Sequence, residues 1–73
     1  MNKEIVEILL QVLNRPVEWR KGQAVYNYAH KMFPKLVQSM DVRHDCFYAD
    51  ELIESFLAEL DRLITKHKND PTI

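Results

Sequence analysis

Apolar residues recur along the start of the chain at the spacing of an amphipathic helix. The pattern predicts a helix over about residues 2–13, with Asn2 as its cap and Glu4 in the first turn, where the helix dipole favours an acid. Its apolar positions span an arc of roughly 200°, about twice what one neighbouring helix covers. They are Ile5, Val6, Ile8, Leu9, Leu10, Val12 and Leu13. The remainder needs either a central place in the core or a second subunit, and Ile8 and Leu10, at the two edges, are the predicted interface residues.

A second helix is expected from Pro16 or Val17 to Met32 or Phe33. Proline suits the first turn of a helix, and Pro34 disfavours helical geometry at the residue before it. Gly22 lies in the middle of the apolar side, where it costs about 1 kcal/mol relative to alanine. We therefore expect another backbone, or the Trp19 ring, to approach closely there.

The rest of the chain predicts a short element and a long closing helix. Leu36, Val37 and Met40 have helical spacing, and a loop should follow over residues 41–45, with a short strand at Val42 as the alternative. The last helix should begin at Asp50 as its cap, with acids in its first turn and bases in its last. Its apolar stripe consists of Leu52, Ile53, Phe56, Leu57, Leu60, Leu63 and Ile64.

These elements predict an all-α fold, a compact bundle of three main helices with a short extra helix or irregular loop before the last. A chain of 73 residues allows one domain, expected over residues 1–68, with a frayed tail over residues 69–73. A single cysteine, Cys46, excludes an internal disulfide and fits a reducing compartment. No apolar run approaches the roughly 20 residues of a membrane span, and no signal peptide is recognisable, so we expect a cytoplasmic protein.

The net charge of −1 conceals two segments of opposite sign. Residues 15–44 contain six basic and two acidic residues, a balance of +4, whereas residues 45–61 contain six acids and no lysine or arginine. The basic segment suits an anionic partner such as nucleic acid. Alternatively, the two segments neutralise each other within the fold or across a dimer, which is the commoner use of such charge blocks.

Two motifs in the middle of the chain resemble a known pattern. Trp19-Arg20-Lys21-Gly22-Gln23 with Asn27 follows W-R-x-G-Q-x-x-x-N, and residues 45–50 follow D-x-F-Y-x-D ahead of an amphipathic helix. The chain thereby resembles a family of small, uncharacterised bacterial and phage-type proteins, over about residues 18–63. The resemblance implies a phage or prophage setting and no biochemical activity. Where relatives tend to have proline just before the Glu-Trp pair, this chain has Pro16-Val17, and this departure predicts a shifted start of the second helix.

Four polar residues of the second helix project within about 80° of one another. Arg20, Gln23, Asn27 and His30 together could hold a carboxylate, a phosphate or a nucleobase. The alternative is structural: Arg20 pairs with Asp45 or Asp50, and the two amides satisfy backbone groups of the loop before the last helix.

The remaining candidates favour structure over chemistry. Trp19, Phe47, Tyr48 and Phe56 are expected to form an aromatic core cluster. The spacing of His44 and Cys46 is too short for the usual zinc sites, and nothing local marks Cys46 as an activated nucleophile. The sequence thus predicts no catalytic residue, no metal and no cofactor.

The function that follows is a small non-catalytic protein-interaction or adaptor module that binds itself or another protein. Its support is the wide apolar arc of the first helix. The alternative is nucleic-acid binding through the basic side chains of residues 15–44, which the overall pI near 6.3 does not favour. The candidate side chains are Arg15, Arg20, Lys21, Lys31, Lys35 and Arg43.

Overall fold

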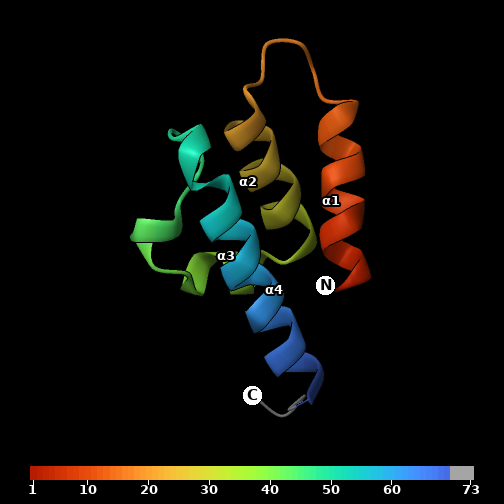
Figure 1. Ribbon diagram of the computed structural model, residues 1–73, viewed down its shortest axis with the longest axis vertical. Helices are drawn as coiled ribbons and strands as arrows, with labels where there is room; N and C mark the ends of the chain where they lie inside the picture. The colour runs from red at the N-terminus through yellow and green to blue at the C-terminus, as the bar shows by residue number, and fades with distance from the viewer. Residues whose placement is uncertain (70–73) are drawn as a thin grey trace.

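The computed structural model describes residues 1–69, and within them the chain forms four α-helices. They are α1 (Lys3–Leu13), α2 (Lys21–Met32), α3 (Pro34–Ser39) and α4 (Ile53–Asn69), with two single-turn 3₁₀ helices, η1 (Val42–His44) and η2 (Asp50–Leu52), between α3 and α4 (Figure 1). The all-α bundle of three main helices with a short extra one is therefore confirmed. Val42 lies in a 3₁₀ turn, so the alternative of a short strand there is wrong.

The second helix begins later than predicted, at Lys21 rather than at Pro16 or Val17. Residues 16–19 instead form a turn, in which the Trp19 N–H donates to the Pro16 carbonyl at 3.0 Å. Arg15 holds this connection from the side, because its guanidinium donates to the carbonyls of Val12 and Trp19 at 3.0 and 2.9 Å. Arg20 is extended and becomes the N-cap residue.

The boundary between α2 and α3 agrees with the prediction, whereas the end of α4 does not. Phe33, just before Pro34, ends α2 as predicted, and Pro34 opens α3 in the first-turn position that proline tolerates. α4 extends through Asn69, so assigning that residue to a frayed tail was wrong. The rest of the predicted tail, residues 70–73, lies outside the described residues.

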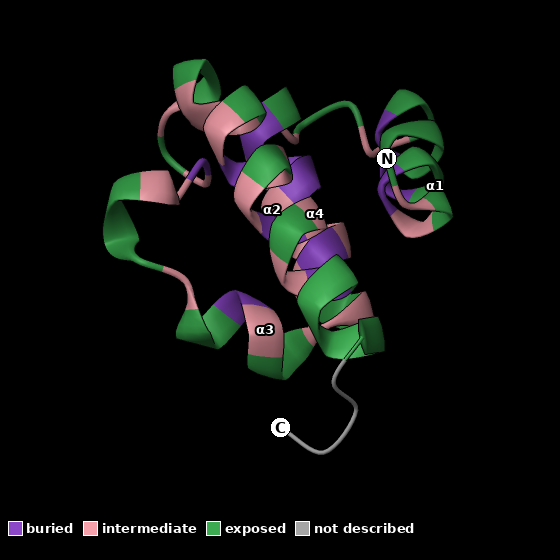
Figure 2. Cartoon of the chain, turned by 60° about the horizontal axis from the view of Figure 1, so that its bottom comes forward, coloured by how far each residue is buried: buried purple, intermediate pink, exposed green. Residues whose placement is uncertain are grey.

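The core lies between α1, α2 and α4, and α2 is its central element. α2 packs against α1 on one side and against α3 and η2 on the other. Figure 2 shows the buried positions as purple segments on the inner surfaces of these helices. The largest fully buried side chains of the core are Ile5, Ile8, Val25, Cys46, Phe56 and Leu60. No helix in the described part of the chain is long and apolar enough to cross a membrane.

The predicted aromatic cluster is only partly formed. Phe47 and Phe56 both pack against Tyr26, with ring centroids 5.6 and 5.9 Å from it. Trp19 packs elsewhere, against Tyr28 at 5.8 Å. Tyr48 contacts Phe47 yet is 82% exposed, so its assignment to the core was wrong.

Candidate functional site

Within residues 1–69, Arg20 forms its side-chain hydrogen bonds with residues near the start of α2 and with none of the other predicted ligand-binding residues. Its guanidinium donates to the Asp50 carboxylate at 3.1 Å and to the Phe47 carbonyl at 2.7 Å. Asp45, the other predicted partner, instead accepts from the backbone N–H of Phe47 at 2.8 Å. The predicted polar network thus forms between Arg20 and Asp50, without Asp45.

His30 lies toward the opposite end of the same helix. Its ring stacks on Tyr26, and its Nε2 lies 3.5 Å from the amide nitrogen of Gln38 on α3. Gln23 and Asn27 lie between Arg20 and His30 on α2 and are half-buried. Within residues 1–69, no hydrogen bond joins any two of these four predicted residues, and ligand binding by them stays a prediction.

The chain approaches itself closely around Gly22. Asp50 accepts from the Gly22 N–H at 3.0 Å, while the buried Cys46 thiol donates to the Gly22 carbonyl at 3.3 Å. A methyl group added at Gly22 would overlap the Cys46 carbonyl oxygen and lie 2.6 Å from the Asp50 carboxylate. The close backbone approach predicted for this glycine is confirmed.

This packing also sets the chemistry of Cys46. Burial, followed by the nearby negative charge of Asp45, raises the pKa of the thiol to about 12. The side chain is therefore a neutral thiol at physiological pH, unlike the thiolate of a nucleophilic cysteine. Among the described residues, no three histidine, cysteine, aspartate or glutamate side chains are grouped so that they could hold a metal ion.

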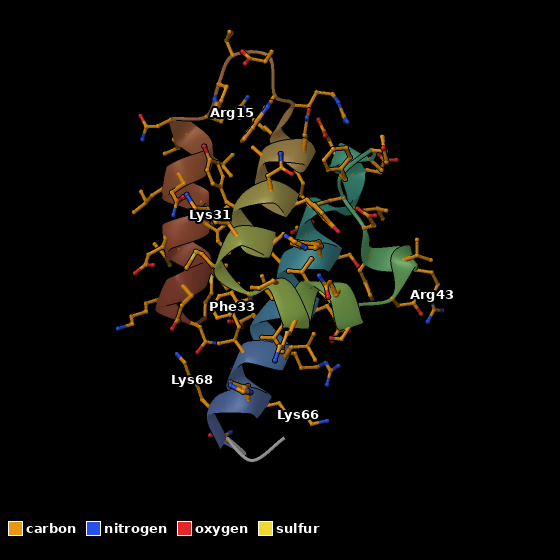
Figure 3. All side chains as sticks on the ribbon, turned by 180° about the vertical axis from the view of Figure 1, so that it is seen from behind. Arg15, Lys31, Phe33, Arg43, Lys66 and Lys68 are labelled. Atoms are coloured by element: carbon orange, nitrogen blue, oxygen red, sulfur yellow. The ribbon has the colours of Figure 1, made fainter. Side chains whose placement is uncertain are left out.

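The six basic side chains of residues 15–44 do not gather in one place. Figure 3 shows Arg15, Lys31 and Arg43 far apart, at one end, at the middle and at one side of the molecule. Arg15 is bonded to backbone carbonyls, and Arg43 pairs with Asp41 at 3.0 Å, an exposed pair that lowers the pKa of this aspartate. The arginines therefore serve turns and helix starts.

The outer face of α1 carries exposed apolar side chains. The inner face buries Ile5, Ile8 and Val12, so the prediction of Ile8 as an interface residue was wrong: it is fully buried within its own chain. Leu10, the other predicted interface residue, is 56% exposed, and Leu13 is 76% exposed. Val6 and Leu9 are also exposed and complete a stripe of four side chains, hereafter the α1 stripe.

The spacing of the whole α1 stripe is visible in the sequence, but the prediction named only the two residues at the edges of the apolar arc. Val6, Leu9, Leu10 and Leu13 follow the i, i+3, i+4, i+7 spacing of one helix face. A helical wheel defines the width of the apolar arc but not which part of it faces the neighbouring helix. In the fold, α1 turns the Ile5–Ile8–Val12 edge of its arc toward the core, which leaves the other half outside.

The N-terminal end of α1 is held against α4 by a cluster of polar side chains. The Asp61 carboxylate accepts from both the backbone N–H and the side-chain amide of Asn2 at 2.8 Å. The same amide donates to Thr65 at 2.9 Å, and Lys68 bonds Asn2 and Glu4 at 3.2 and 3.1 Å. This cluster holds α1 in place without using its outer face.

No known protein family matches the chain, and no curated protein or solved structure is significantly similar to it. The resemblance to the phage-type family stays a prediction.

Proposed function

We propose that the protein is a small non-catalytic interaction module that forms homo-oligomers through the α1 stripe. The observation that carries the proposal is the exposure of Val6, Leu9, Leu10 and Leu13 on one continuous helix face. Val17, in the turn after α1, adds a further, almost fully exposed apolar side chain. Together they present several hundred Å² of apolar surface, the size at which a patch on a small monomer marks an interaction site.

The geometry of α1 suits helix-to-helix packing. A stripe at i, i+3, i+4 and i+7 forms the ridge that packs into the groove of a facing helix. α1 is also firmly positioned, because three buried side chains fix its inner face and the Asn2–Asp61 hydrogen bonds fix its start. Little ordering is then required when a second copy packs against it, and this lowers the entropic cost of association.

The nucleic-acid alternative has less support. Arg20 and Arg43 form ion pairs with Asp50 and Asp41, and Arg15 is bonded to backbone carbonyls, so half of the candidate cations have partners within the fold. A nucleic-acid surface usually gathers its lysines and arginines on one face. The α1 stripe needs no such grouping and is already continuous.

A cytoplasmic location is part of the proposal. The single cysteine is buried as a neutral thiol beside Gly22 and forms no disulfide within the chain. A fold that depends on a reduced, packed thiol suits a compartment that keeps thiols reduced.

The experiment measures the mass of the protein in solution by size-exclusion chromatography with light scattering over a range of concentrations. We expect an oligomer for the wild type and a folded monomer for Leu10→Glu. A buried carboxylate in the interface should weaken self-association by at least about 30-fold, the equivalent of ~2 kcal/mol at an interface hot spot.

Gln11→Glu is the matched control, since it adds the same charge at the next position of α1 but on the polar side of the helix. It should keep the oligomer. Circular dichroism should show native helix content for both variants, because Leu10 and Gln11 are exposed. A monomeric wild type at the highest concentration, or an oligomeric Leu10→Glu, would refute the proposal.

A further inference from the structure

A second apolar surface lies away from α1, between α3 and the C-terminal half of α4. It consists of two adjoining depressions of about 360 and 170 Å³, which share Leu36 and His67. The larger extends over Phe33 and Pro34, and the smaller over Ser39 and Leu63. We call the pair the α3–α4 groove.

The groove combines an apolar floor with a basic rim. Phe33, Pro34, Leu36 and Leu63 supply the floor, whereas Lys35, Lys66 and His67 stand around it and are exposed. Figure 3 shows Lys66 on the lower part of α4 and Phe33 above it, nearer the middle of the molecule. Among residues 1–69, no acidic side chain lines either depression.

The lysines of the rim differ from the neighbouring Lys68. Lys68 turns toward α1 and is satisfied there by Glu4 at 3.1 Å. Within residues 1–69, neither Lys35 nor Lys66 forms an ion pair. The groove thus concentrates positive charge beside apolar surface in a protein whose net charge is −1.

We propose that the α3–α4 groove binds an acidic segment of a partner protein that also carries large apolar side chains. Charge complementarity selects the acidic character, and the floor selects the apolar anchors. A phosphate backbone would match the lysines but leave Phe33, Leu36 and Leu63 without partners. The groove is separate from the α1 stripe, so one surface serves self-association and the other a foreign chain.

The test selects short random peptides by display on the immobilised full-length protein, followed by fluorescence anisotropy with the enriched peptides. We expect sequences rich in aspartate and glutamate with at least one large apolar residue. Lys35→Glu combined with Lys66→Glu should weaken their binding at least about tenfold. Replacement of the apolar residue of the peptide by serine should weaken it as well.

Lys3→Glu combined with Lys31→Glu is the matched control, because it makes the same change in net charge at exposed positions outside the groove. It should leave the affinity within about twofold. The Leu10→Glu variant should bind the peptides like the wild type, which separates this proposal from self-association through α1.

Four outcomes would overturn the proposal. They are the absence of enriched acidic peptides, equal weakening by the groove and control variants, tighter binding of single-stranded DNA or anionic lipid vesicles than of the peptides, and loss of the oligomer in the groove variant. The last would mean that the groove is occupied by a second copy.

Discussion

Two aspartates of the C-terminal half perform the same task at two helix starts. Asp50 accepts from the backbone N–H of Gly22 at the start of α2, and Asp61 accepts from that of Asn2 at the start of α1. In neither helix does the side chain of the N-cap residue accept a hydrogen bond from a first-turn N–H. Both starts are therefore satisfied by residues distant in sequence, which ties helix formation to the tertiary fold.

The surroundings of the two aspartates differ. The backbone of Gly22 packs directly against the backbone of Cys46, whose carbonyl leaves no room for a methyl group. Around Asn2, the contacts are made by side chains that include Thr65 and the long, adaptable Lys68. The first site therefore depends on shape, and the second depends on hydrogen bonding and charge.

Gly22→Ala tests the dependence on shape and should have the largest effect. The added methyl must displace the Cys46 carbonyl, which belongs to the backbone and cannot withdraw cheaply, and it pushes the Asp50 carboxylate away from the Gly22 N–H. We expect a loss of about 3 kcal/mol or more in the free energy of unfolding, measured by urea denaturation followed by circular dichroism.

Gln23→Ala, at the next position of α2, is the control and should change stability by no more than about 0.5 kcal/mol. If Gly22→Ala were as stable as the wild type, the claim that the Gly22 site depends on shape would be wrong. The higher helix propensity of alanine would then have outweighed the steric overlap.

The sequence predicted the shape-dependent site better than the polar one. A glycine in the middle of an apolar helix face lowers the stability of the helix. Its presence there predicted that another backbone approaches closely. Arg20–Asp50 was one of two pairings that the charges allowed. Asn2, by contrast, has all the features of a local helix cap, so nothing in the sequence indicated its bonds to a residue 59 positions away.

Other predictions were wrong where contacts made by the folded chain override the local preferences of single residues. Pro16 favours a helix start, yet the bonds from Arg15 to the chain hold residues 16–19 as a turn. Asp50 was predicted to cap its own helix, but its carboxylate is used by α2. The basic rim of the α3–α4 groove was missed because Lys35 and Lys66 are 31 positions apart and only the fold brings them together.

Asp50→Ala should have an intermediate effect. It removes the acceptor for the Gly22 N–H and the partner of Arg20 while leaving the close backbone packing in place. The loss of a helix cap costs about 1 kcal/mol, and the exposed ion pair adds little. The midpoint of urea denaturation reports the change.

Glu51→Gln provides the control for Asp50→Ala, since it removes a negative charge at the adjacent exposed position. It should leave the midpoint nearly unchanged. An equal loss in both variants would mean that the net charge of this segment, and not the cap on α2, determines stability.

Asp61→Asn should have the smallest effect at neutral pH, and that effect should depend on pH. The backbone N–H of Asn2, its side-chain amide and more distant positive charges lower the pKa of Asp61 from its ordinary value of 3.8. A carboxyl group whose pKa is lower in the folded state stabilises the fold above the ordinary value and loses this contribution as the pH falls through the folded value. The wild type should therefore be more stable than Asp61→Asn at pH 7, and the difference should shrink below about pH 4.

Urea denaturation of both proteins at several pH values measures this difference, with Glu54→Gln as a control carboxylate on the exposed side of α4. Glu4 and Asp41 also have lowered pKa values, so the total acid sensitivity of the wild type is not informative by itself. The difference between wild type and variant isolates Asp61. If it stays constant from neutral to acidic pH, the hydrogen bonds to Asn2 do not depend on the charge of Asp61, and both helix starts are maintained by geometry alone.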